Sequence, residues 1–185
     1  MNRPISVREL GRLARDRGGA TAVEFALILM ALIMLSLGIL EFTLLMFDFL
    51  RADEATRRGA RLAAISEPVG NLDNLASADV RCTWSGGAAS CVGGVVANPA
   101  TFDRVVAAMR QVYPDLTAGN VQITYRASGV GLAEAGGYKP YVEVSLTGFK
   151  RSFYVLQAVA GIAPTITMPA FATTLLGNSY QPSGA

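Results

Sequence analysis

The chain has 185 residues, of which 51% are hydrophobic and 16% are charged, whereas ordinary soluble domains carry about 25% charged residues. Some of its apolar surface therefore faces something other than water. The chain contains no His, the commonest general base and metal ligand, and its two Cys cannot build a four-thiolate zinc site. Beyond residue 19 the net charge is −1, so no large basic field argues for nucleic-acid binding.

An arginine-rich leader over residues 1–19 is followed by a long apolar run. Phe25 to Leu40 contains no charge, and counting on to Phe47 gives a helix of about 34 Å at about 1.5 Å per residue. That length spans a bilayer core of about 30 Å. A buried core helix is the alternative, but so small a domain has little to surround a helix that is apolar on every face. We therefore expect a transmembrane helix over residues 20–48, in contact with the lipid bilayer.

Charge gives little guidance on orientation, because four arginines follow the span closely (Arg51, Arg57, Arg58 and Arg61) and the positive-inside bias is weak. A secretory signal peptide has an apolar region of about 7 to 15 residues and a small-residue cleavage site. The run here is longer, and residues 39–47 offer no such site. The segment is therefore expected to stay as an anchor.

Glu24 stands at the head of the apolar run. An ionised group costs several kcal/mol in hydrocarbon unless it is paired or reaches the interface, and the positive end of the helix dipole offsets part of that cost. One interpretation is a carboxylate that starts the helix at headgroup level. The other is a functional acidic group.

The order of these features resembles a known signal. Gly19 ends the basic leader, four small or apolar residues follow, and Glu24 and Phe25 begin the span. This pattern resembles the class III signal of type IV pilins and pseudopilins. With Glu41 and Phe42 late in the span, it looks most like the TadE and TadF pseudopilins of the tight-adherence, or Flp-type, pilus system. Ala20 departs from classical pilins, which usually begin with a large apolar residue.

The resemblance implies cleavage by a prepilin peptidase between Gly19 and Ala20, which makes Glu24 the fifth residue of the mature chain. It implies a single-pass protein of the bacterial inner membrane, with a cytoplasmic N-terminus and a periplasmic C-terminal domain, that primes or enters a pilus. The implied partners are the peptidase, other pseudopilins, the major pilin and the inner-membrane assembly platform. A type II secretion pseudopilin and an unrelated signal-anchored periplasmic domain are the alternatives.

The helical pattern continues beyond the span as an extension over residues 49–67. Asp53 with Arg57 and Glu54 with Arg58 are i,i+4 pairs of acid before base. One side holds only small residues, so a helix or sheet could approach closely (Ala52, Ala55, Gly59, Ala60, Ala63 and Ala64). We expect one helix from about 20 to 65, ended by Pro68 and Gly70, and the alternative is a break near Asp48.

Glu41 lies inside the far end of the span, ten or more residues before the nearest plausible cations of the chain, Arg51 and Arg57. It could extend outward to the interface or face a partner helix. We expect an intermolecular contact, and the assembly residues are then Glu24, Phe25 and Glu41.

Residues 71–180 predict a small periplasmic α+β domain, so the fold class is α+β with a long N-terminal transmembrane helix. Residues 80–84 and 92–97 are strand candidates on either side of a Ser-Gly-Gly turn. Cys82 and Cys91 bracket that turn, and in an oxidising periplasm we expect a disulfide between them. In the reversed orientation, two unpaired thiols are the alternative.

The rest of the domain predicts a helix opened by Asn98 and Pro99 and running to about Tyr113. Residues 120–127 and 141–149 alternate as strands, joined by a Gly-rich loop over 129–137. The tail from Phe153 fits either helix or strand, and residues 181–185 are expected to be disordered.

Little in the domain points to chemistry. Gly129 and Gly131 begin a dinucleotide-like pattern, but Glu134 occupies the position that needs Gly or Ala. No G-x-S-x-G elbow or S-x-x-K pair occurs, and the acidic residues are scattered. We therefore expect no catalytic residue, no cofactor and no metal site, and not an enzyme.

Overall fold

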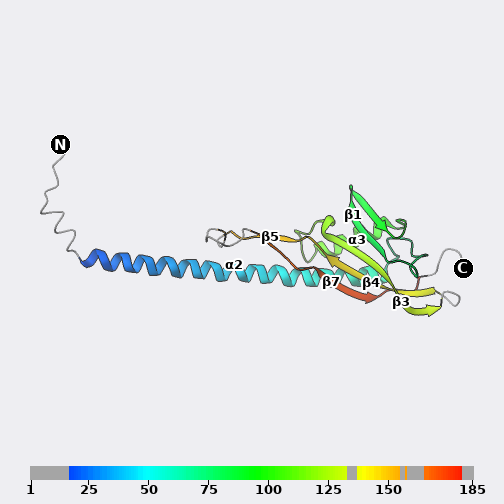
Figure 1. Ribbon diagram of the computed structural model, residues 1–185, viewed down its shortest axis with the longest axis horizontal. Helices are drawn as coiled ribbons and strands as arrows, with labels where there is room; N and C mark the ends of the chain where they lie inside the picture. The colour runs from blue at the N-terminus through cyan, green and yellow to red at the C-terminus, as the bar shows by residue number, and fades with distance from the viewer. Residues whose placement is uncertain (1–16, 133–136, 155–156, 158–164, 181–185) are drawn as a thin grey trace.

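The computed structural model describes residues 17–132, 137–154, 157 and 165–180. Its dominant element is a single helix, α2 (Arg17–Ile65), which carries a small sheet-rich domain on its C-terminal half (Figure 1). The N-terminal half extends beyond the domain with no other element beside it. The α+β class with an N-terminal helix long and apolar enough to cross a membrane is confirmed.

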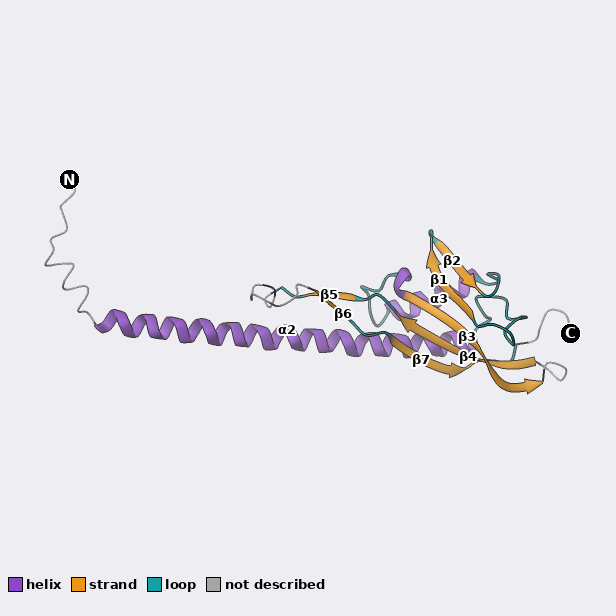
Figure 2. Cartoon of the chain, in the orientation of Figure 1, coloured by secondary structure: helices purple, strands orange, loops and turns teal. Residues whose placement is uncertain are grey.

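The domain contains a five-stranded antiparallel sheet in the order β2-β1-β3-β4-β7. The strands are β1 (Val80–Ser85), β2 (Ala88–Val92), β3 (Val121–Leu132), β4 (Gly137–Leu146) and β7 (Phe171–Leu176). Helix α3 (Pro99–Arg110) and a short 3-10 turn, η1 (Ala118–Asn120), connect β2 to β3. A separate two-stranded ribbon of β5 (Lys150–Ser152) and β6 (Thr165–Thr167) extends alongside α2 toward its N-terminal half (Figure 2).

The core forms where α2 and α3 pack with the inward side chains of the sheet. These buried side chains come from alternate strand positions, as half-buried strands require, and include Val80, Ile123, Tyr125, Val142 and Val144. Helix α3 ends at Arg110, short of the predicted end near Tyr113, and its side chains Phe102, Val105, Val106 and Met109 are buried in the core.

The small-residue side of α2 is the side that the domain covers. Ala52, Ala55, Ala60 and Ala63 are at most 1% exposed. A Cβ built on Gly59 would lie 2.7 Å from the Sδ atom of Met109, so this position has no room for a side chain. The expectation that small residues let another element approach closely is confirmed, and the alternative of a helix broken near Asp48 is wrong.

Two of the predicted details on α2 and the first hairpin need correction. Asp53 and Arg57 form the expected ion pair at 3.0 Å, but Arg58 donates to the Gln111 side chain at 3.3 Å rather than pairing with Glu54. The return strand predicted over 92–97 is wrong. It occupies Ala88–Val92 because Gly86 and Gly87, both at positive φ, make a two-residue turn that pairs Ser85 with Ala88.

The Gly-rich loop predicted over 129–137 is shorter than expected. The β3–β4 pairing shifts register between Ala127 and Gly131 and then continues to Leu132 and Gly137. Gly129 lies in this irregularity with φ at 69°. A residue with a Cβ would adopt that backbone conformation only with steric strain. The undecided tail forms β6 and β7, and the disorder expected for 181–185 lies outside the described residues.

The predicted disulfide between Cys82 and Cys91 is confirmed. The two residues are direct partners in the β1–β2 ladder, and Cys82 is fully buried. Gly70 packs against both sulfurs, since a Cβ there would lie 3.2 and 3.3 Å from them. The disulfide therefore links β1 to β2, and the chain segment that follows α2 packs over it at Gly70.

Replacing both cysteines with Ala should lower the free energy of unfolding of the domain by about 2 to 3 kcal/mol, because the unfolded chain regains the freedom of the closed loop. Thermal melting of the detergent-solubilised protein would measure this. The same protein with Ser90→Ala, which alters the hairpin surface and keeps the bridge, is the control. An equal melting temperature for the double variant and the control would contradict the prediction.

Candidate functional site

The first candidate surface is the bare half of α2, residues 19–40. Every residue there is exposed except Gly38, which is partly covered. The best window has a mean hydropathy of 2.6 and none of it is buried, which excludes a soluble core helix. At about 1.5 Å per residue, the bare half is about 33 Å long. This segment is therefore a candidate single membrane span.

The hydroxyls near this segment are compatible with hydrocarbon. Ser36 donates to the Leu32 carbonyl and Thr43 to the Ile39 carbonyl, both at 2.8 Å. Such bonds to the preceding turn satisfy a hydroxyl without a partner helix. These groups therefore create no need for an outside contact.

Glu24 is different. It is exposed, and among the described residues it has no hydrogen bond or ion pair. Phe25 beside it is 64% exposed. The carboxylate thus lies on a bare apolar helix, one turn along from Ala20, where it is accessible to groups outside the chain.

Gly19 lies within α2, and a Cβ built on it would meet nothing within 4 Å. Gly in the interior of a helix costs roughly 0.5 to 1 kcal/mol relative to Ala. Gly59 contrasts with it, because packing against Met109 explains that residue. Neither packing nor backbone conformation explains a glycine at position 19.

The second candidate surface is the junction where the domain first covers α2. Glu41 is only 9% exposed, and its carboxylate accepts a hydrogen bond from the Tyr154 backbone N–H. This contact lies within the chain, and the intermolecular contact expected at Glu41 stays a prediction. The intrachain partner of Glu41 comes from the segment just after β5, a region whose secondary structure the sequence left open.

Asp48, two turns further along, is also buried and lies 2.9 Å from a guanidinium nitrogen of Arg151 on β5. The sequence did not single out this pair, because the two residues are about a hundred positions apart. A buried carboxylate needs a partner charge, and Arg151, late in the chain, supplies it. Glu41 and Asp48 together fasten the β5–β6 ribbon to α2.

Tyr113 lies close to this junction. Its ring packs edge-on against Phe149 with centroids 5.2 Å apart, and its hydroxyl is buried with no hydrogen-bond partner among the described residues. Burial, together with the nearby Asp48 carboxylate, raises its pKa to about 12. Burial also raises the pKa of Tyr125 to about 12, although its oxygen accepts a 3.1 Å bond from the Val69 N–H.

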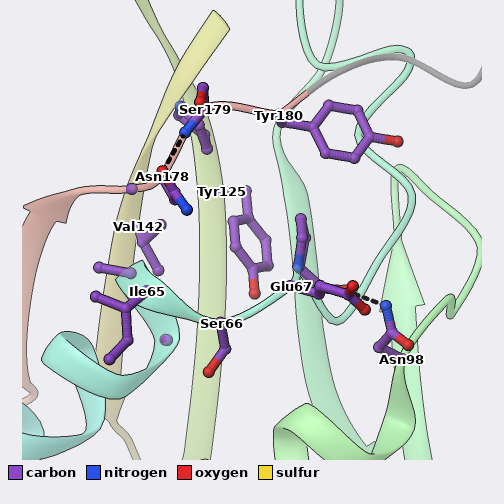
Figure 3. A pocket seen from close by; sticks show the side chains of 14 residues that line it. Ile65, Ser66, Glu67, Asn98, Tyr125, Val142, Asn178, Ser179 and Tyr180 are labelled. Carbon is purple, nitrogen blue, oxygen red and sulfur yellow. Dashed lines mark hydrogen bonds between the residues drawn. The ribbon is translucent and has the colours of Figure 1, made fainter. Parts of the chain in front are cut away.

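Tyr125 also lines a pocket of about 320 Å³ at the C-terminal end of α2 (Figure 3). The pocket lies between the helix end and the segment after β7, with Glu67, Asn98 and Asn178 among its polar lining residues. Tyr180 at its rim bonds to the Asp73 side chain at 3.0 Å. Across the described residues, no three His, Cys, Asp or Glu side chains gather as a metal site.

Residues 19–61 match the family model described as TadE-like protein. Over this stretch the chain is similar to TadE-like proteins. The matched residues contain Gly19, Glu24, Phe25 and Glu41, on which the resemblance to the tight-adherence system was based. No curated protein and no solved structure matches the chain. The TadE-like match thus covers most of α2 and does not extend into the sheet domain.

The two buried tyrosines give opposite expectations for removal of the hydroxyl. Tyr113→Phe should leave the free energy of unfolding at pH 7 unchanged or raise it by up to about 1 kcal/mol, because an unbonded buried hydroxyl is removed. Tyr125→Phe should lower it by about 1 to 3 kcal/mol, because the Val69 N–H loses its acceptor. Denaturant unfolding of the matched pair measures both, and equal effects would contradict the assignment.

The same tyrosines should make the protein unstable in alkali. Below pH 10 the phenols are protonated in both states, so they add no pH dependence. Between pH 10 and 12 the unfolded phenols ionise while the folded ones hold their protons, so stability falls as pH rises. Tyr113→Phe should therefore show a shallower loss over that interval.

Proposed function

We propose that this TadE-like chain is a minor pseudopilin that takes part in assembling a tight-adherence, Flp-type pilus. In this proposal a prepilin peptidase cuts between Gly19 and Ala20, and the mature chain stays in the bacterial inner membrane with its domain in the periplasm. It acts through helix–helix packing with other pseudopilins and the major pilin on the inner-membrane assembly platform.

Gly19 is the observation that carries the proposal. It lies in a helix with open space at its Cβ position, so the fold itself offers no reason for glycine there. A peptidase cleft that must accept the backbone at this point does offer one. The position between the arginine-rich leader and the apolar helix is where such a peptidase acts in the pilin family.

Two further observations support the proposal. The exposed apolar side chains of residues 19–40 give a surface that can pack against lipid and against other helices. The Cys82–Cys91 disulfide favours an oxidising compartment for the domain, which in a bacterium is the periplasm.

Glu24 has a role in this assembly step. Cleavage leaves a free amine on Ala20, and an unpaired charge becomes costly when the helix enters an apolar bundle. The carboxylate of one chain can offset the amine of the next in neighbours staggered by a few ångströms. An amine–carboxylate contact within one chain across the same turn is the competing geometry.

Gly19→Val should leave the uncleaved precursor in the membrane, because the added side chain blocks the cleft. Gly18→Ala, on the adjacent residue, should be processed normally. Intact-mass analysis of protein purified from native membranes distinguishes the two lengths. Product of normal length from Gly19→Val would remove peptidase processing from the proposal.

Glu24→Gln should insert and be cleaved at least in part, yet fail to restore pili to a strain that lacks the gene. The neutral amide keeps the shape of the side chain and loses the charge that pairs with the amine. Thr21→Ser, a conservative change on the same bare segment, should restore pili. Full piliation with Glu24→Gln would assign the carboxylate to helix initiation alone.

A further inference from the structure

The contact between the domain and α2 begins at a well-defined position along the helix. Residues 19–40 are bare, and Glu41 is the first buried residue of the helix. The bare length of about 33 Å is close to the bilayer core thickness of about 30 Å. If the bare segment spans the bilayer, Glu41 lies where the helix leaves the hydrocarbon.

The element found at that height is the arm, defined here as β5, Phe153, Tyr154, β6, Met168 and Pro169. The arm extends beside α2 toward the bare half, away from the five-stranded sheet (Figure 2). Glu41 holds it through the Tyr154 backbone N–H, and Asp48 holds it through Arg151. Both attachments use carboxylates, which are costly deep in hydrocarbon and tolerable at the interface.

The exposed groups of the arm suit a lipid interface. Tyr154 is 78% exposed and Ile166 is 41% exposed, and tyrosine is enriched at the headgroup level of membranes. Lys150, four residues before Tyr154 in the chain, is exposed, whereas Arg151 is paired with Asp48. Cations near an anionic lipid surface contribute about 1 kcal/mol each.

An apolar groove connects the arm with the helix surface. A pocket of about 210 Å³ lies between Phe42, Met46 and Phe49 of α2 and residues 166–169 of the arm. Phe42 and Met46 are 64% and 49% exposed, so the groove opens onto the same apolar side chains that continue down the span. Its lining is continuous with the surface that faces lipid.

We propose that the arm is a second membrane contact, which rests on the headgroup layer of anionic phospholipid where α2 leaves the bilayer. Tyr154 and Ile166 enter the interface, Lys150 binds lipid phosphate, and Glu41 together with the Asp48–Arg151 pair fixes the arm at this height. The inference rests on the membrane-spanning part of the proposed function and is independent of peptidase processing and of pilus assembly.

A fluorescent probe on the arm can test the contact. The two native cysteines are joined to each other, so Tyr154→Cys provides a single reactive thiol and keeps the backbone N–H that bonds to Glu41. The full chain, labelled with a nitrobenzoxadiazole maleimide, is placed in nanodiscs of phosphatidylethanolamine and phosphatidylglycerol. Lipids spin-labelled at the headgroup or in the acyl chain serve as quenchers.

Two matched positions calibrate the signal. Leu32→Cys lies on the bare half of α2 and is 57% exposed in the native residue, whereas Val95→Cys is 77% exposed beyond the other end of the helix, beside Asn71. We expect headgroup-labelled lipid to quench the probe at 154 at least threefold more strongly than the probe at 95. Acyl-labelled lipid should quench the probe at 32.

Equal, weak quenching at 154 and 95, with strong quenching at 32, would overturn the proposal while leaving the membrane span intact. Quenching at 154 that appears only when a nanodisc holds more than one copy would also overturn it, in favour of a contact between subunits. Strong quenching at 154 in nanodiscs with one copy supports it, whether or not Gly19→Val and Glu24→Gln behave as the pilus proposal expects.

Discussion

The structure depends on one helix that must satisfy two solvents. Along residues 19–40 α2 is almost entirely apolar and bare, burial begins at Glu41, and from Ala52 onward the buried side carries small residues beneath the domain. If the domain packed on one face of the bare segment, the other apolar faces would stay exposed. The alanine side of the covered half, by contrast, lets α3 and the sheet approach the helix backbone closely. The change of side-chain size along α2 therefore sets where the domain can sit.

Two carboxylates lie near the point where α2 passes from its bare half to its covered half, and residues late in the chain supply their partners. Glu41 takes a backbone N–H and Asp48 takes a guanidinium, both from residues 151–154. Most of the core between helix and sheet is apolar, with packing rather than charge holding it together. The polar contacts of Glu41 and Asp48 thus lie where the apolar core ends, at the edge of the domain nearest the bare segment.

Much of this arrangement could be read from the sequence, and the failures have physical causes. Helix continuity followed from the absence of Pro and from small residues repeating on one side, and the disulfide followed from the Cys positions around a Gly-Gly turn. The return strand was misplaced because the turn at Gly86 and Gly87 contains only two residues, so the strand begins at Ala88 rather than at residue 92. The partners of Glu41 and Asp48 could not be found, because a contact across a hundred residues leaves no local pattern.

The unbroken helix also has a mechanical consequence. Since α2 is one unbroken helix, a domain carried on a bilayer-spanning α2 would move together with the span, as a lever whose fulcrum is the membrane surface. Single spans tilt by about 20° on average, and over the roughly 38 Å of α2 beyond Leu40 such a tilt would displace the far end sideways by about 13 Å. The far end carries the Cys82–Cys91 hairpin and the pocket beside Tyr180, so small rotations within the bilayer become large, directed excursions of the surface that is furthest from it.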